Sequence, residues 1–306
     1  MSAKSILEYD GKALLAYWLF KSPSVTTEPT GATLSPPPLL RTPLITNLRS
    51  SAILLTCSAV AQIQFESPHS IAPENYPAHV KEVLDRAEAL HPWVKDGRKL
   101  VAKPDMLIKR RGKSGLLCLN KGWEDSRKWI EERAGKLQKV SLISQHWGLI
   151  RFQVEHVQGY LTNFLVEPFV PHAQETEYYI NINSEREGDN ILFYHEGGVD
   201  VGDVDAKASK IIIGPSDQFP SFITLKRELL AKVPVKSQDV LIDFIVRLYS
   251  VYVDLQFTYL EINPLVVIPT AVIPLGLEIP PANFYLGLRR SPLPRLGCQT
   301  RSNRRL

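Results

Sequence analysis

The sequence predicts an α+β fold, built from helices and strands that alternate along the chain without an internal repeat. Amphipathic helical stripes are one sign of this, and the clearest comprises Val240, Leu241, Phe244, Ile245, Leu248 and Tyr252. Short apolar or alternating runs of the kind that form strands lie between the helical segments. An apolar content of 44% with 22% charged residues is that of an ordinary globular protein.

The first half of the chain predicts three helices and two short strands. Apolar spacing indicates a first helix of about three turns between Ile6 and Trp18. A second helix is expected over residues 78–90, because its apolar side chains fall on one face. Strands are expected at 100–103 and 116–119, on either side of a glycine-containing loop, and a third helix at 123–137.

The second half predicts a hairpin, several strands and one long helix. Residues 177–183 alternate, turn at 187–190 and return as 191–194, which is typical of a β-hairpin. Further strands are expected at 163–170 and 210–213, and the amphipathic stripe is followed by a strand over 257–267.

Two segments, residues 20–62 and 268–306, are expected to be irregular. Together they hold 12 of the 23 prolines, which remove backbone donors and are excluded from helix interiors. The second segment holds six arginines and one acid, Glu278, so much of the net charge of +4 comes from this tail. The basic balance therefore does not indicate nucleic-acid binding, which requires a basic face on a folded surface.

The remaining composition excludes two other classes. The longest apolar run, residues 53–61, is far shorter than the roughly 18 residues of a membrane helix. Three cysteines without metal-binding spacing argue against a disulfide scaffold and favour a reducing compartment.

A basic, glycine-containing loop is the first candidate for chemistry. Between Lys103 and Gly115 lie five basic residues and two glycines. Backbone amides in such a loop, with cations beside them, suit a polyphosphate. Walker-loop spacing is absent, and a solvated surface turn remains the alternative.

A strand end flanked by prolines is the second candidate. Pro168 and Pro171 enclose Phe169 and Val170 and leave backbone groups unpaired. Such groups can bind the edge of an adenine, and the nearby acid Glu177 can accept ribose hydroxyls. An edge strand that simply ends here is the alternative.

A carboxylate and an amide form the third candidate. Glu261 and Asn263 lie two residues apart on one strand face and provide the hard oxygens that Mg²⁺ prefers. A second nearby acid would be expected, and Glu278 is the only acid downstream. In the fourth candidate, residues 195–205, the EF-hand order is absent, and His195 is interpreted as a structural histidine.

In this order the motifs resemble a known family. They read Lys-Pro-Asp-x-Leu-Ile-Lys-Arg-Arg-Gly-Lys, Phe-Leu-x-Glu-Pro-Phe-Val-Pro-His, Arg-Glu-Gly-Asp, His-Glu-Gly-Gly-Val-Asp-Val-Gly-Asp-Val-Asp-Ala-Lys and Phe-Thr-Tyr-Leu-Glu-Ile-Asn-Pro-Leu-Val-Val. This set closely resembles the N-terminal region of the animal ATP-citrate lyase family, also called ATP-citrate synthase. The resemblance implies an ATP-grasp fold, with two α/β lobes around a nucleotide cleft, related to the succinyl-CoA synthetase β subunit.

The resemblance also implies roles for individual residues. Lys103, Arg111 and Gly112 would contact the ATP phosphates. Pro168 and Val170 would frame the adenine, with the Val170 backbone as the hydrogen-bonding group, and Glu177 would bind the ribose. Asn263 would help to hold Mg²⁺, and no residue is assigned a catalytic role.

The domain organisation follows from where the resemblance holds. Residues 1–19 and 63–267 are expected to form the ATP-grasp domain, interrupted near 139–155. Residues 20–62 are expected to be an irregular insert and 268–306 an irregular tail that leaves the fold incomplete at the C-terminus. Without its final hairpin, the strand at 257–267 is expected to present an exposed apolar edge.

The functional expectation is Mg·ATP binding for citrate activation. Family enzymes convert citrate, CoA and ATP into acetyl-CoA and oxaloacetate in the cytosol, through a phosphohistidine and citryl-CoA. Citrate and CoA would bind only through regions missing here, so the chain is expected to be inactive alone, and the full-length family enzyme is a possible partner. The alternatives left open are a succinyl-CoA-synthetase-like β subunit, a non-catalytic partner-binding or misfolded chain and, more remotely, a nucleic-acid binder using the basic tail.

Overall fold

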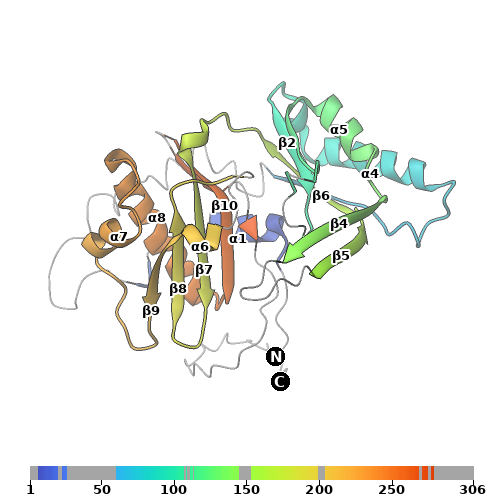
Figure 1. The fold of residues 1–306 in the computed structure, drawn as a ribbon. Coiled ribbons are helices and arrows are strands. Elements are labelled where there is room, and N and C mark those ends of the chain that lie inside the picture. The colour runs from blue at the N-terminus through green and yellow to red at the C-terminus, as the bar shows by residue number, and fades with distance from the viewer. Residues whose placement is uncertain are drawn as a thin grey trace, which may run out of the picture.

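The computed structural model describes residues 6–19, 23–25, 60–106, 108, 111–112, 114–144, 153–198, 204–268, 271–274 and 277–278. Within these residues the elements form two α/β lobes, with helix α1 (Glu8–Trp18) between them (Figure 1). All the strand pairs described are antiparallel. The predicted α+β class is therefore confirmed.

The first lobe is a four-stranded sheet covered by two helices. The strands lie in the order β1 (Ala61–Gln64), β6 (Asn163–Pro168), β2 (Leu100–Pro104) and β3 (Cys118–Lys121). Helices α4 (Tyr76–Leu90) and α5 (Trp123–Glu131) and the 3-10 turn η3 (Pro92–Lys95) pack against this sheet. The α4 core residues are Val80, Val83, Leu84 and Ala87, the apolar face expected from the sequence. Strands β4 (Leu137–Ser144) and β5 (Gln153–Tyr160) form a separate hairpin.

The second lobe is a larger sheet packed against a long helix. Its strand order is β11 (Ala271–Pro274), β10 (Tyr259–Ile268), β7 (Glu177–Ser184), β8 (Asp189–Tyr194) and β9 (Ser209–Ile213), and β12 (Leu277–Glu278) also pairs with β10. The helices of this lobe are α6 (Val204–Lys207), α7 (Phe222–Glu228) and α8 (Val235–Asp254), and the 3-10 turn η4 (Gln174–Thr176) precedes β7.

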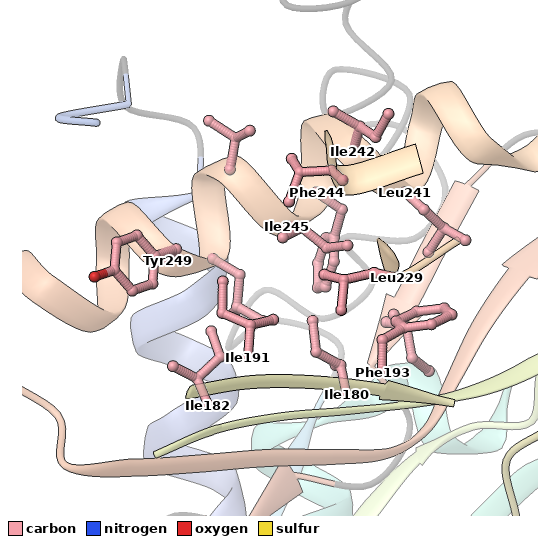
Figure 2. Packing of buried hydrophobic residues seen from close by; sticks show 14 of the residues in the cluster. Ile180, Ile182, Ile191, Phe193, Leu229, Leu241, Ile242, Phe244, Ile245 and Tyr249 are labelled. Atoms are coloured by element: carbon pink, nitrogen blue, oxygen red, sulfur yellow. The ribbon is translucent and has the colours of Figure 1, made fainter. Parts of the chain in front are cut away.

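The core of the second lobe follows from the two side-chain periodicities. On β7, alternate residues Ile180 and Ile182 face one way, because successive strand side chains point to opposite faces. Figure 2 shows these side chains opposite the α8 residues Phe244 and Ile245, which lie on the stripe predicted from the sequence. The long helix is therefore held by packing of its apolar face.

Helix α1 is attached to both lobes. Leu15 and Leu19, at its C-terminal end, belong to the core of the second lobe. At the other end, Glu8 and Lys12 reach charged side chains on the first lobe's strands β2 and β6. One short helix thus joins the apolar core of one lobe to charged side chains on the two central strands of the other.

The helix expected over 123–137 is wrong in its second half. Helix α5 ends at Glu131, and residues from Leu137 onward form β4. Gly135 has a φ of 69°, a left-handed conformation that suits glycine after a helix C-terminus. Its N–H donates to the Leu161 carbonyl at 2.8 Å, and a Cβ at this position would lie 2.3 Å from the Tyr76 ring.

The segment after residue 267 is more regular than predicted. Strands β11 and β12 pair with β10, so the edge expected to be exposed is covered along these residues. Strand β11 ends at Pro274, because proline cannot continue a sheet ladder. Most of the predicted insert, residues 26–59, and residues 279–306 lie outside the described part of the chain.

Three further features bear on earlier expectations. The interruption expected near 139–155 includes the backbone-paired parts of β4 and β5, and residues 145–152 between them are not described. Among the described residues, no helix is both long and apolar enough to cross a membrane. Cys118 is a buried free thiol.

Candidate functional site

A buried ion cluster surrounds the predicted phosphate-binding lysine. We define it as Glu8 and Lys12 of α1, Lys103 of β2, Glu167 of β6 and Arg111. The Lys103 Nζ lies 2.7 Å from both Glu8 Oε1 and Glu167 Oε1. The Lys12 Nζ lies 2.8 Å from Glu8 Oε1 and 2.5 Å from Glu167 Oε2. The Arg111 guanidinium lies 2.7 Å from Glu8 Oε2. Because these side chains are at most 11% exposed, their charges act on one another with little screening by water.

The cluster shifts the pKa values of its members. Burial alone would raise the pKa of Glu8, but Lys103, Lys12 and Arg111 together hold that pKa well below its usual value. Burial lowers the pKa of Lys12, yet Glu167 and Glu8 outweigh this and leave it raised. For Lys103 burial outweighs the two carboxylates, and its pKa is lowered. The predicted phosphate ligand is therefore a desolvated amine, whose charged form is opposed by burial, Lys12 and Arg111 more than Glu8 and Glu167 support it.

Asp105 fixes the N-terminus of α1 against the cluster. Its Oδ1 accepts the Glu8 N–H at 2.8 Å and the Tyr9 N–H at 3.4 Å, and its Oδ2 accepts from the Gln62 amide at 3.2 Å. A carboxylate at this end of a helix satisfies otherwise unpaired N–H groups and complements the helix dipole. Burial and the neighbouring Glu8 raise the pKa of Asp105.

The predicted phosphate loop is held by its arginine. The Arg111 guanidinium donates to the Pro104 carbonyl at 2.9 Å, and the Arg111 carbonyl accepts the Leu116 N–H at 2.9 Å. Gly112 lies at the tip, where its carbonyl accepts the Gly115 N–H at 3.2 Å. Lys109, Arg110 and Lys113, the other cations of the motif, lie outside the described residues.

A second set of contacts links the remaining predicted residues. We call Val170, His172, Glu177, Gly198 and Asn263 the Glu177 network. The His172 ring places Nδ1 2.7 Å from the Val170 carbonyl oxygen and Nε2 2.9 Å from Glu177 Oε1. The Gly198 N–H donates to Asn263 Oδ1 at 2.9 Å. These residues come from four parts of the chain: the β6–β7 connection, strand β7, the loop that follows β8, and strand β10.

Gly198 allows the close approach on which this network depends. Its φ of 97° lies in the left-handed region, and a Cβ there would stand 2.1 Å from Glu177 Oε2. The neighbouring Gly197 lies close to the Tyr178 backbone, where a Cβ would be 2.5 Å from the carbonyl oxygen. The two glycines therefore bring the loop after β8 against the start of β7.

Asn263 has the donor chemistry for Mg²⁺ but would supply only one oxygen. Its amide oxygen is a hard donor, and the bond from Gly198 fixes it in place. The described residues contain no group of three or more His, Cys, Asp or Glu side chains suited to a metal ion. The nearby Glu261 accepts a hydrogen bond from the Tyr259 hydroxyl, and its Cα pairs in register with that of Glu278 on β12. The donor type therefore fits Mg²⁺ that obtains further oxygens from nucleotide phosphates and water.

Strand β6 and the residues just after it contribute to both the ion cluster and the Glu177 network. Glu167 belongs to the ion cluster, Pro168 ends the strand, and Val170 begins the Glu177 network. No role was predicted from the sequence for five residues of these groups: Glu8, Lys12, Glu167, His172 and Gly198. For Glu167 a signal was present, because a single carboxylate in an otherwise apolar strand requires a partner when buried.

Comparisons with known proteins agree with this fold. The family described as ATP-citrate synthase ATP-grasp domain matches residues 45–279. The chain is 55% identical over 292 residues to a probable ATP-citrate synthase subunit 2 from Schizosaccharomyces pombe, covering 94% of this chain and 51% of that protein. It is 46% identical over 188 residues to human ATP-citrate synthase, covering 61% of this chain and 16% of that protein.

A solved structure gives the same result. The ATP citrate lyase from Methanothrix soehngenii, solved in complex with citrate and coenzyme A, matches with a TM-score of 0.60 and 27% identity, covering 90% of this chain and 50% of that one. The fold is of the ATP-grasp type, as the resemblance implied. The chain belongs to the ATP-citrate synthase ATP-grasp domain family. It spans about half the length of the yeast relative and about a sixth of the human one.

Proposed function

We propose that this chain binds Mg·ATP, with the phosphates at the ion cluster and the nucleoside at the Glu177 network. The observation that carries the proposal is that contacts join Val170, Glu177 and Asn263 through His172 and Gly198. These three residues are the ones that the resemblance assigns to the adenine, the ribose and the metal. Pro168, at the end of β6, would frame the adenine with Val170.

The charge of the ion cluster supports its assignment to the phosphates. Lys12, Lys103 and Arg111 carry one charge more than Glu8 and Glu167 together. Phosphate oxygens that arrive here compete with Glu8 for Lys103 and Arg111, and the Gly112 turn supplies backbone beside them. Fixed cations of this kind stabilise the charge that spreads over a phosphoryl group as it is transferred.

Mg²⁺, when bound, would neutralise charge on the phosphate oxygens. Asn263 would be its protein ligand, held by the Gly198 N–H, while Glu177 would accept the ribose hydroxyls. The role of the chain's own residues is to bind and orient the nucleotide, and none is assigned a covalent role.

The larger activity that we propose is citrate activation toward citryl-CoA in the cytosol, leading to acetyl-CoA and oxaloacetate. Family membership and the archaeal relative solved with citrate and coenzyme A support this proposal. Citrate and CoA would be bound by regions beyond those matched here, and an ATP-citrate synthase subunit is the proposed partner, as the name of the yeast relative implies. The paired strands β11 and β12 favour this function over the alternative of a chain with an exposed β10 edge.

Titration calorimetry with Mg·ATP tests the nucleotide assignment. Glu177→Gln should weaken binding about tenfold, because hydrogen bonds to a charged group are worth roughly 1.5–3 kcal/mol. Glu175→Gln is the matched control, since this neighbouring acid is exposed on η4, and it should bind within about twofold of wild type. Equal affinity of the two variants would contradict the ribose assignment, and no binding by the wild-type chain would contradict the proposal as a whole.

A further inference from the structure

His172 contacts both Val170 and Glu177, two residues of the proposed nucleotide site, but the proposed function assigns no role to His172 itself. The side chain is 12% exposed and that of Glu177 is 18% exposed. Its Nδ1 lies 2.7 Å from the Val170 carbonyl oxygen and its Nε2 lies 2.9 Å from Glu177 Oε1. The ring therefore spans the connection from the end of β6 to the start of β7.

Both partners of the ring are hydrogen-bond acceptors. A backbone carbonyl can only accept, and an ionised carboxylate can only accept. Each ring nitrogen lies within hydrogen-bonding distance of one of these acceptors, so the ring bridges the two groups. Such a ring fixes the distance between a carbonyl and a carboxylate, which an apolar side chain could not do.

The contacts leave specific groups of Val170 and Glu177 for a ligand. The ring engages the carbonyl of Val170 and leaves its N–H, the group suited to a purine ring nitrogen. Glu177 is restrained on both sides, because His172 holds Oε1 and the Gly198 backbone lies against Oε2. A carboxylate held in this way keeps lone pairs for two vicinal hydroxyls.

We propose that His172 is a positioning residue for the nucleoside, holding the Val170 backbone and the Glu177 carboxylate at the separation that an adenine and its ribose require. The proposal rests on the proposed function, because it names how the nucleotide site is organised. It assigns His172 to recognition of the nucleoside and not of the phosphates, whose proposed ligands lie in the ion cluster.

Binding of three probes to wild type and His172→Ala tests this assignment. The probes are Mg·ATP, adenosine and tripolyphosphate. His172→Ala should weaken Mg·ATP and adenosine about tenfold, as expected for the loss of bonds to a charged group, and should change tripolyphosphate binding less than about twofold. His69→Ala is the control, because His69 is exposed and its ring packs against Tyr160 in the first lobe, and it should change none of the three.

A double-mutant cycle with Glu177→Gln tests whether His172 acts through Glu177. In the Glu177→Gln background, the effect of His172→Ala on adenosine affinity should shrink to less than about threefold. Unchanged adenosine binding by His172→Ala, equal weakening of all three probes, or a full effect in both backgrounds would each overturn the inference while leaving Mg·ATP binding intact. Failure of the wild-type chain to bind either nucleotide or nucleoside would overturn the proposed function and this inference together.

Discussion

Gly198 shows how a single backbone position shapes this site. Its positive φ and its contact with Glu177 Oε2 leave no room for a side chain, while its N–H fixes the Asn263 amide. A residue without a Cβ therefore determines where both the predicted ribose ligand and the predicted metal ligand lie. Gly198 lies in the loop after β8, and ligand-binding groups are commonly placed on loops that a rigid scaffold holds.

Gly198→Ala, compared with a glycine variant that has similar backbone strain but no contact with Glu177, tests whether this contact matters for binding. The added Cβ would push the Glu177 carboxylate aside, and Mg·ATP affinity should fall about tenfold. Gly97→Ala is the matched control, because Gly97 has a similar φ of 90° but nothing within 4 Å of its Cβ. Both variants should lose about 1 kcal/mol of stability from backbone strain, measured by urea unfolding. Equal Mg·ATP affinity of the two variants would show that the contact with Glu177 does not matter.

Asp243 predicts a specific pH dependence of stability. It is buried on α8, where burial raises its pKa to about 6 although the bond from Arg247 opposes this. The folded state therefore holds the Asp243 proton more tightly than the unfolded state, and this contribution to stability falls as pH rises from about 4 to about 6. Lowering the pH from 7 to 5 should stabilise wild type by about 1 kcal/mol more than Asp243→Asn, measured by urea unfolding. Parallel pH profiles of the two proteins would contradict the assignment.

Among the secondary-structure elements, helix α1 attaches the two lobes to each other. It is a short helix with apolar residues in one lobe and charged residues against the other. Burial of charges stabilises a fold only when partners are well placed, and here each carboxylate contacts at least two cations. The position of the predicted phosphate-binding lysine thus depends on a helix about 95 residues away in sequence.

Glu8→Gln should therefore destabilise the fold strongly. Removing the Glu8 carboxylate leaves Lys12 and Lys103 to share Glu167 and takes away the carboxylate that Arg111 contacts. Loss of one partner from a buried ion pair costs about 3–5 kcal/mol. Lys81→Gln is the surface control, because its ion pair with Asp85 is exposed and should contribute less than about 1 kcal/mol. Urea unfolding measures both, and similar losses of stability would mean that the cluster does not hold α1.

Helices and strands could be predicted from the sequence where the residues that determine them lie close together along the chain. The stripe on α8 was visible because a helix buries residues at a fixed period. Strand β7 was visible because residues 177–183 alternate, and β8 because an apolar run follows the turn at 187–190. The end of α5 was missed because its causes lie far away in sequence: the Gly135 N–H donates to the Leu161 carbonyl, and the Tyr76 ring leaves no room for a Cβ at Gly135. Strand β1 was missed because its four residues form a strand only by pairing with β6.

For the whole molecule, the motifs indicated the residues of the site but not their contacts. Lys103 and Arg111 were expected beside phosphates, yet their carboxylate partner Glu8 comes from a distant helix. The roles of His172 and Gly198 could not be predicted, because they depend on where β7, β10 and the loop after β8 meet. The nucleotide assignments themselves stay predictions.

We propose that the ion cluster and the Glu177 network bind the two ends of one nucleotide. A crystal structure of this chain with Mg²⁺ and a non-hydrolysable ATP analogue would test this directly. The adenine should lie against the Val170 backbone, the ribose hydroxyls on Glu177, and phosphate oxygens within hydrogen-bonding distance of Lys103 or Arg111. A nucleotide that contacts only one of the two groups, or binds elsewhere on the chain, would contradict it.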